Sequence, residues 1–229
     1  MSGPGLSPVI FVTGTDTDVG KTIATAALAA LLRSRGRTVA VYKPTQAGTS
    51  DGLGDIDVVR RLTGLDDVHE GIRLPDPMAP VAAAARAGVR LPSAADHASA
   101  IGRLAGAHDH TLVEGAGGLL VALDADGRTL ADIAVTAGSS ATAVVVCRSG
   151  LGTLNHTELT LEALGRRGVA AAGTIIGSWP RDPTDIDVSN RDHFRAHAVP
   201  LIGVIPQGVA ALAAPEFTAS AASWFRGPW

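Results

Sequence analysis

Short apolar runs alternate with longer amphipathic segments along the chain. The runs are typical of buried strands, which we place at Val9–Val12, Thr38–Tyr42, Thr111–Val113, Ala141–Cys147, Val169–Ile176 and Leu201–Ile205. Helical patterns occur at Thr22–Arg35, Ile56–Leu62, Val81–Ala87, Ala94–Leu104, Arg128–Ala137 and Leu154–Arg167, and a C-terminal helix is expected within 208–226. Strands that alternate with helices predict a mostly parallel central sheet, flanked by helices on both faces, in a single α/β domain over residues 1–229.

Three segments rich in glycine or proline are expected to be loops. Residues 74–80, LPDPMAP, hold three prolines and are predicted to be irregular or extended. Asp51–Gly54 is predicted to be a loop, and Gly115–Gly118 a turn that follows the strand Thr111–Val113.

Composition narrows the class of protein. Of 229 residues, 46% are hydrophobic but only 3% are aromatic, so small aliphatic side chains must do the packing. The net charge of −3 argues against a nucleic-acid partner, and the one cysteine, Cys147, excludes an intramolecular disulfide. The N-terminal stretch is unlike a signal peptide, and we find no run of about 18 apolar residues. We therefore expect a cytoplasmic protein with no membrane partner.

A phosphate-binding loop follows the first strand. The stretch GTDTDVGKT, Gly14–Thr22, connects a predicted strand to a predicted helix, as such loops require, although five residues separate Gly14 from Gly20 where four are usual. We expect Lys21 to reach the β- and γ-phosphates of a nucleotide and Thr22 to bind Mg²⁺. Asp16 is interpreted as a residue that points to solvent or holds the turn. Asp18 could do the same or lie near a metal or cationic substrate.

Two acidic residues and a second lysine are candidates for the same site. Glu114 ends the strand Thr111–Val113, where a carboxylate that binds Mg²⁺ is expected. Asp55 could bind the same metal or cap the helix that follows it. Lys43 comes at the end of the predicted strand Thr38–Tyr42 and is followed at once by Pro44. A cation at the sheet edge beside a γ-phosphate indicates a second anion, carried by a phosphoryl acceptor.

Taken together, several motifs resemble those of the dethiobiotin synthetase family. They are GTDTDVGKT, the Lys-Pro pair in VYKPTQAGT, PMAP (Pro77–Pro80), VEGAGGLLV (Val113–Val121) and GLGTLNHTELTLEAL up to Leu164, so the similarity runs from about residue 9 to 205. The resemblance implies a P-loop NTPase-like cyclo-ligase that uses ATP, Mg²⁺ and CO₂ to close the ureido ring of 7,8-diaminopelargonate.

The resemblance also implies roles for particular residues. Lys21 and Lys43 would be catalytic, and Thr22, Asp55 and Glu114 would bind Mg²⁺. The nucleotide would contact Thr17, Asp18, Val19, Gly20, Lys21, Thr22, Ile23, Glu114, Gly177, Ser178, Pro206, Gln207 and Gly208. The substrate would contact Lys43, Ala47, Gly115, Ala116, Gly117, Gly118, Leu151, Gly152 and Asn155, the last three reaching the site of a neighbouring subunit in a homodimer.

This chain departs from the family pattern at three points. One is the segment Ile205–Ala211, where only Pro206 matches the family's loop beside the nucleotide base. Ala47 stands where the family commonly has a serine or threonine, so Thr45 or Thr49 would have to supply that hydroxyl. Gly177 and Ser178 follow the strand Val169–Ile176 where many members carry an asparagine that reads adenine. The preference of this chain for one nucleotide base therefore stays open.

Two other functions are compatible with a phosphate loop. An ATPase switch of the partition or septum-positioning type usually has a lysine after the first glycine of the loop, where this chain has Thr15. A nucleotide-binding regulator without chemistry would not need Lys43 and Glu114 alongside Lys21. The resemblance therefore favours the synthetase.

Overall fold

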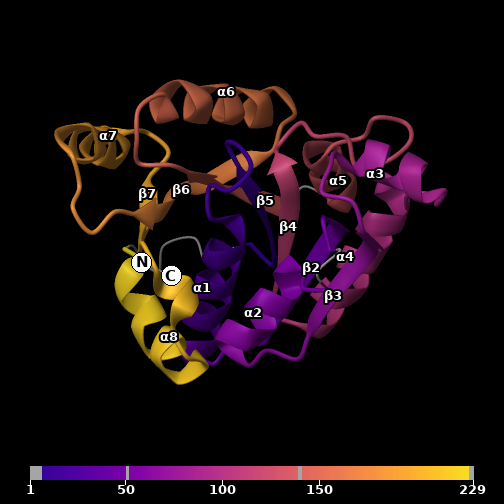
Figure 1. The fold of residues 1–229 in the computed structure, drawn as a ribbon, viewed down its shortest axis with the longest axis horizontal. Coiled ribbons are helices and arrows are strands. Elements are labelled where there is room, and N and C mark those ends of the chain that lie inside the picture. Colours follow the sequence, from indigo (N-terminus) through magenta and orange to yellow (C-terminus); the bar gives the residue numbers. More distant parts are fainter. Residues whose placement is uncertain (1–6, 50–51, 139–140, 227–229) are drawn as a thin grey trace.

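The computed structural model describes residues 7–49, 52–138 and 141–226, in which the chain forms one seven-stranded sheet. All strand pairs are parallel, and the order across the sheet is β3-β2-β4-β1-β5-β6-β7 (Figure 1). Asp51, part of one predicted loop, lies outside the described residues. The strands are β1 (Val9–Gly14), β2 (Val39–Ala47), β3 (Val68–Leu74), β4 (His110–Gly118), β5 (Ala141–Cys147), β6 (Ala170–Trp179) and β7 (Leu201–Pro206).

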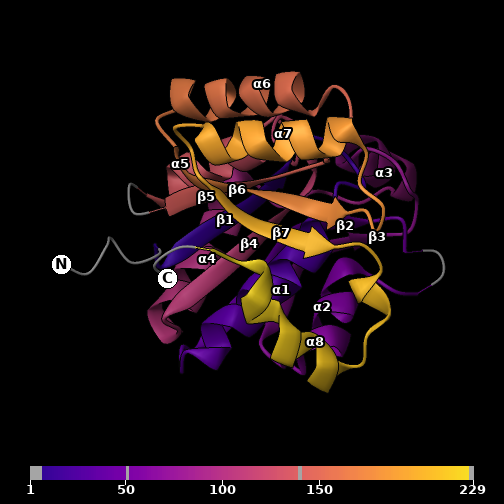
Figure 2. The ribbon, with the colours of Figure 1, turned by 90° about the vertical axis from the view of Figure 1, so that its left-hand side faces the viewer.

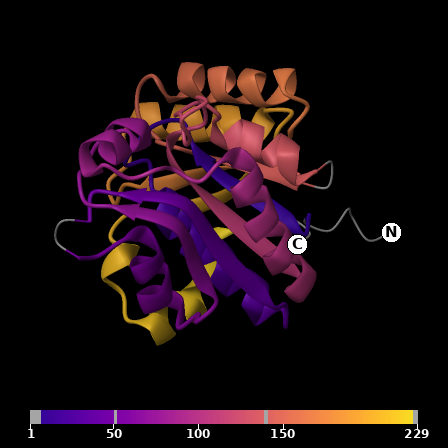
Figure 3. The same cartoon turned by 90° about the vertical axis from the view of Figure 1, so that its right-hand side faces the viewer.

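Helices cover both faces of the sheet, as predicted. One face carries α1 (Lys21–Ser34), α2 (Asp55–Thr63) and α8 (Ala214–Ala221), and Figure 2 shows them below the sheet with α6 and α7 above it. The long magenta helix in Figure 3, α4, packs against β2 and β4. The remaining helices are α3 (Pro80–Ala87), α4 (Ala94–Ala107), α5 (Leu130–Ala137), α6 (Thr153–Arg166) and α7 (Asp185–Ala196).

The first strand is apolar throughout because both of its faces are buried. Ile10 and Val12 pack in the cluster that contains α1, whereas Val9 and Phe11 pack on the other face with residues of α4 and α5. A central parallel strand reads as a continuous apolar run for this reason. No helix among the described residues has both the length and the apolar character needed to cross a bilayer.

The two strands that carry functional residues are longer than predicted. β2 continues through Pro44 to Ala47, so the prediction that Lys43 ends the strand was wrong. Pro44 is tolerated because β2 pairs with β4 only as far as Tyr42, and beyond that point pairs with β3 alone. β4 likewise continues through Gly118, so Gly115–Gly118 belongs to the strand instead of forming the predicted turn, although Gly117 has a left-handed φ of 64°.

Three further elements differ from the prediction. β3 was missed because its residues alternate polar and apolar at the edge of the sheet instead of forming an apolar run. The residues at which the helix α7 begins and ends were not predicted. The expected helix within 208–226 consists of short pieces, and Pro215 stands in the first turn of α8, where a proline needs no N–H partner.

Candidate active site

The phosphate loop connects β1 to α1 and is held by the neighbouring strands. The Thr15 N–H donates to the Val146 carbonyl at the end of β5, at 3.0 Å. Gly20 has a φ of 95°, and a Cβ added there would lie 2.7 Å from the Gly177 carbonyl oxygen of β6. The first turn of α1 has no side-chain cap, so its N–H groups and partial positive charge remain free for an anion.

Asp16 and Lys21 both bond within this loop. The Asp16 carboxylate accepts from the Thr17 N–H at 2.7 Å and lies 3.5 Å from the Arg148 guanidinium. Its backbone carbonyl accepts from Lys21 Nζ at 2.8 Å. The interpretation of Asp16 as a turn residue is therefore confirmed. Asp18, with a φ of 55°, lines the cleft described below.

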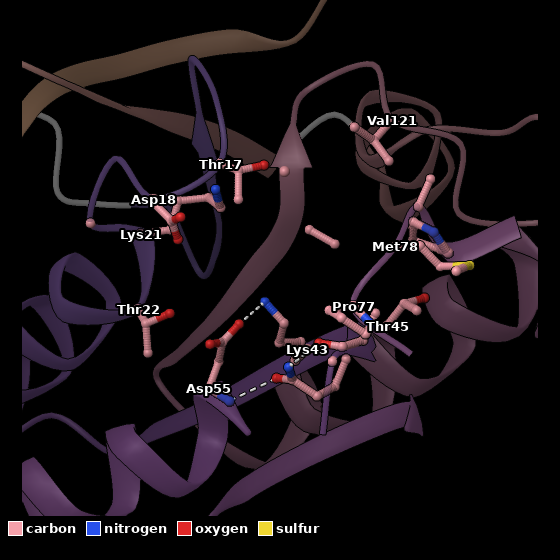
Figure 4. A pocket seen from close by; sticks show the side chains of 18 of the residues that line it. Thr17, Asp18, Lys21, Thr22, Lys43, Thr45, Asp55, Pro77, Met78 and Val121 are labelled. Atoms are coloured by element: carbon pink, nitrogen blue, oxygen red, sulfur yellow. Dashed lines mark hydrogen bonds and ion pairs between the residues drawn. The ribbon is translucent and has the colours of Figure 1, made fainter. Parts of the chain in front are cut away.

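Lys43 lies at the centre of a buried charge cluster (Figure 4). Its ammonium donates to Glu114 Oε1 at 3.0 Å and to the Gly115 carbonyl at 3.1 Å, and it forms an ion pair with Asp55 Oδ2. Thr22 Oγ1 donates to the same Glu114 oxygen at 2.8 Å. Lys43 is 2% exposed and Glu114 1%. The three N–H bonds of the ammonium are thus all used within the protein.

Burial and mutual charge shift the pKa of each group in the cluster. Burial raises the pKa of Glu114, and Lys43 opposes this while Asp55 adds to it. Burial alone would lower the pKa of Lys43, but Glu114 and Asp55 outweigh it and raise that pKa. Burial also opposes the charge of Asp55, yet the ammonium of Lys43 lowers its pKa. For Lys21, burial and then the charge of Lys43 lower the pKa.

The oxygens around Lys43 fit a magnesium ion. Glu114 Oε2 is buried and has no hydrogen-bond partner, while Thr22 and Asp55 lie beside the same carboxylate. Among the described residues, no group of three or more histidine, cysteine or acidic side chains is placed so that it could hold a metal ion. A cation here would therefore be held by two carboxylates, one hydroxyl and oxygens from outside the protein, which is the usual arrangement for Mg²⁺ beside phosphates.

A cleft of about 820 Å³ opens between the phosphate loop and β2. Figure 4 shows Thr22, Asp55 and Lys43 on one side of it, and Pro77 and Met78 on the other. Glu114 and Gly115 do not line the cleft but contact Lys43, which does. The cleft is lined by about half of the residues predicted for the site: Thr17, Asp18, Gly20, Lys21, Thr22, Ile23, Lys43, Ala47, Asp55, Ala116 and Gly117.

The other predicted residues lie outside the lining of this cleft. Val19 is buried in the core. Gly118 belongs to a shallower groove beside α6. The remaining ones occupy two places, with Gly177, Ser178, Pro206, Gln207 and Gly208 at the ends of β6 and β7, and Leu151, Gly152 and Asn155 at the start of α6.

Gln46 is a site residue that sequence reasoning missed. Its side-chain oxygen accepts from the Asp55 N–H at 2.7 Å, so it fixes the first residue of α2 beside Lys43. Pro77, Met78, Ala79 and Val121 also line the cleft without a predicted role. A glutamine in a loop-like stretch carries no motif, whereas the PMAP segment was visible in the sequence as part of the resemblance.

The two threonines proposed to compensate for Ala47 differ in position. Thr49 Oγ1 donates to the Leu74 carbonyl at 3.1 Å and is absent from the lining of the cleft. Thr45 lines the cleft, and its buried hydroxyl has no protein partner. Thr45 is therefore the better candidate for a substrate contact.

Solved structures with the same fold include functionally different proteins. The septum site-determining protein MinD from Pyrococcus horikoshii OT3, complexed with Mg-ADP, is 21% identical with a TM-score of 0.57, over 94% of this chain and 86% of that one. Chloroplast FtsY from Physcomitrella patens is 17% identical with a TM-score of 0.56, over 96% of this chain and 67% of that one. At these identities the likeness shows the fold alone.

Sequence relatives are much closer. A family model described as an AAA domain matches residues 9–213. The chain is 52% identical over 221 residues to the ATP-dependent dethiobiotin synthetase BioD of Mycobacterium avium (strain 104), covering 96% of both chains. It is 49% identical over 223 residues to the protein of that name from Rhodococcus jostii (strain RHA1), again covering 96% of both. With a phosphate loop and a buried lysine–carboxylate cluster in one cleft, the chain belongs to the ATP-dependent dethiobiotin synthetase family.

Proposed function

We propose that this chain is a cyclo-ligase that converts 7,8-diaminopelargonate, CO₂ and ATP into dethiobiotin, ADP and phosphate in biotin biosynthesis. Its membership of the family supports this reaction. The structural observation that carries the proposal is the pair of lysines in one cleft, with Lys21 on the phosphate loop and Lys43 buried beside Asp55 and Glu114.

The reaction joins a carbamate to the γ-phosphate of ATP and then releases phosphate. One amine of the substrate adds to CO₂ and loses a proton, which gives a carbamate. A carbamate oxygen attacks the γ-phosphorus of ATP, and ADP leaves with the electrons of the broken P–O bond. The second amine attacks the carbonyl carbon of this mixed anhydride, closes the ring, releases phosphate and gives up a proton. None of these reaction steps needs a nucleophilic side chain, so the protein accelerates them by positioning the reactants and stabilising their charges.

The donor side is formed by the phosphate loop and α1. Lys21 exchanges its bond to the Asp16 carbonyl for the phosphates, and the free N–H groups at the start of α1 add to this attraction. Thr22, Asp55 and Glu114 would hold Mg²⁺, which neutralises part of the phosphate charge when bound.

The acceptor side depends on Lys43. Two unit anions 4 Å apart repel each other by about 4 kcal/mol at an effective dielectric constant near 20, so the carbamate needs a nearby cation. All three N–H bonds of Lys43 are used within the protein, so contact with the carbamate requires the ammonium to release at least one of its partners. Thr45 supplies a hydroxyl on the same strand.

The substrate carboxylate is held by a second subunit of a homodimer. Leu151, Gly152 and Asn155 lie at the start of α6, outside the cleft of their own subunit, which is consistent with a role in the partner's cleft. Two large apolar side chains next to them, Leu120 and Leu159, are more than half exposed. Burial of these leucines against a second copy would favour association.

The test is whether phosphate release depends on the acceptor. Purified protein is given MgATP and bicarbonate, with and without 7,8-diaminopelargonate, while phosphate is measured and the organic product is identified by its mass. We expect phosphate and dethiobiotin to form in equal amounts, and only when the diamine is present. Rapid phosphate release that ignores the diamine would favour an ATPase switch, and no release under either condition would also overturn the proposal.

A further inference from the structure

The loop of residues 148–152, between β5 and α6, is held from outside by α7. Asn190 of α7 is 8% exposed, and its Nδ2 donates to the Ser149 carbonyl at 2.7 Å and to the Gly150 carbonyl at 3.0 Å. Both N–H bonds of the amide are thus used on one loop. α7 runs alongside α6 on the same face of the sheet (Figure 2), and Phe194 of α7 packs in one cluster with Leu154 of α6.

Further bonds complete the attachment of this loop. The Asp187 carboxylate, one turn before Asn190, accepts from Thr184 Oγ1 at 2.6 Å, and the Ser149 side chain beside it lowers the pKa of Asp187. At the other end, Thr153 Oγ1 donates to the Arg148 carbonyl at 2.7 Å. Gly152 has a φ of 87°, which turns the backbone into α6. The loop therefore has a fixed path although its tip, Leu151, is 88% exposed.

We propose that Asn190 is a positioning residue for acceptor binding and that it acts on the site of the partner subunit. This inference rests on the proposed function, in which Leu151, Gly152 and Asn155 hold the substrate carboxylate across the dimer. α7 supplies no residue to the cleft of its own subunit. Its two buried bonds end on the carbonyls immediately before Leu151, so they set where the start of α6 presents its N–H groups.

The same loop also has a contact within its own subunit. Arg148 donates to the Thr17 carbonyl of the phosphate loop at 3.0 Å. A change at Asn190 could therefore act on the partner's acceptor or on its own nucleotide. The first route predicts weaker acceptor binding with unchanged nucleotide binding, and the second predicts weaker nucleotide binding. Measuring both therefore distinguishes the two routes.

The first measurement compares Asn190→Asp with the wild type. The aspartate has the same shape but faces two carbonyl oxygens with acceptors only, so the loop loses both bonds. We expect KM for diaminopelargonate to rise roughly tenfold or more, kcat at saturation to stay within about twofold, and the dissociation constant for MgADP to be unchanged. Amide hydrogen exchange should be faster at residues 149–153.

Two other variants control this measurement. Asn190→Ala removes the donors without adding a charge and should show the same KM effect if the aspartate variant is unstable. Ser189→Ala changes the neighbouring, exposed position on α7 and should match the wild type. An unchanged KM in Asn190→Ala, with unchanged exchange at 149–153, would overturn the proposal.

The second measurement tests whether the effect crosses the dimer. Asn190→Asp subunits are mixed with Lys43→Met subunits, at a diamine concentration where neither alone turns over appreciably. A mixed dimer has one cleft with Lys43 intact and the unaltered loop of its partner, so random mixing should restore about a quarter of wild-type activity. No restoration, together with weakened MgADP binding by Asn190→Asp, would show that Asn190 acts on its own phosphate loop and would overturn the proposal.

The wild-type protein separates failure of this inference from failure of the proposed function. If wild type shows no phosphate release that depends on the diamine, the synthetase function itself is wrong. If wild type is active and Asn190→Ala behaves like it, the function stands and the role of Asn190 is wrong.

Discussion

At the scale of single residues, the site combines three charges that would each be costly alone. Lys43 and Glu114 are almost completely buried, and an isolated buried charge is strongly unfavourable. Their contacts with each other and with Asp55 keep Lys43 charged, as the raised pKa of its ammonium shows. Lys43 therefore partly neutralises the two carboxylates in the absence of any ligand, a role that its place in the sequence did not reveal.

Backbone proximity at Gly177 leads to a first prediction. A Cβ at Gly177 would lie 2.1 Å from the Val19 carbonyl oxygen, and the phosphate loop would have to move to make room. Gly177→Ala should therefore weaken MgADP binding by roughly tenfold or lower the unfolding free energy by about 1–3 kcal/mol. Nucleotide titration and urea unfolding measure the two effects.

A matched glycine provides the control for this prediction. Gly165 lies inside α6, where an added Cβ meets nothing within 4 Å. Gly165→Ala should raise the unfolding free energy by about 0.5–1 kcal/mol and leave nucleotide binding unchanged. Wild-type behaviour of Gly177→Ala in both measurements would show that the phosphate loop does not depend on this contact.

At the scale of elements, three helices start with the same arrangement. A hydroxyl residue precedes each of α4, α5 and α7, and the aspartate three residues later accepts hydrogen bonds from its N–H and its hydroxyl. In α5, Asp132 accepts from both the N–H and the hydroxyl of Thr129, at 2.8 and 2.7 Å. These bonds outweigh burial and lower the pKa of Asp132.

This lowered pKa makes the contribution of Asp132 depend on pH. Because the folded-state pKa lies below the unfolded value near about 3.9, the contribution is present above that value and is lost as the pH falls through the folded pKa. Asp132→Ala should lower the unfolding free energy by about 1 kcal/mol at pH 7. The difference in unfolding free energy between this variant and wild type should become smaller below about pH 4. Urea unfolding from pH 7 to below about pH 4 measures this difference, with Asp182→Ala in an exposed loop as control.

How well an element could be predicted depended on whether one pattern dominated it. β1 and β5 are mostly apolar, and their prediction was confirmed. β2 and β4 were cut short because Pro44 and the glycines of GAGG resemble stops. Both strands continue after their pairing with each other ends at Tyr42, because β2 still pairs with β3 and β4 with β1. Local sequence does not record that a strand has lost its neighbour.

The candidate site was predicted to a similar extent. Lys21 and Thr22 belong to a motif that follows β1, and Glu114 lies on the neighbouring strand β4, so their convergence followed from a parallel sheet. Gln46 reaches Asp55 through a hydrogen bond between β2 and α2, which depends on how the helix is placed. Asn190 of α7 bonds to the loop of residues 148–152, and this contact likewise depends on how its helix is placed. No pattern in the sequence indicates either contact.

At the scale of the whole molecule, the proposed site is complete only in a dimer. Leu159 is 56% exposed on α6, beside Leu120, in the groove that also contains His156. Leu159→Arg should convert dimers to monomers in sedimentation velocity, and should weaken binding of diaminopelargonate while nucleotide binding stays within about twofold, because only the acceptor site spans two subunits.

A second exposed apolar residue controls this prediction. Val89 is 46% exposed in the loop before α4, far in the sequence from α6. Val89→Arg should leave both the sedimentation coefficient and acceptor binding unchanged. Unaltered acceptor affinity in a monomeric Leu159→Arg protein would contradict the shared site.

The division of labour between the two lysines is the central claim, and one comparison tests it most directly. Lys43→Met and Lys21→Met are each measured for MgADP affinity and for phosphate release in the presence of bicarbonate and diaminopelargonate. We predict that Lys43→Met binds MgADP within a few-fold of wild type but releases phosphate about 100-fold or more slowly, whereas Lys21→Met loses nucleotide affinity as well. If Lys43→Met loses MgADP affinity as fully as Lys21→Met does, Lys43 serves the nucleotide and not the acceptor, and the account is wrong.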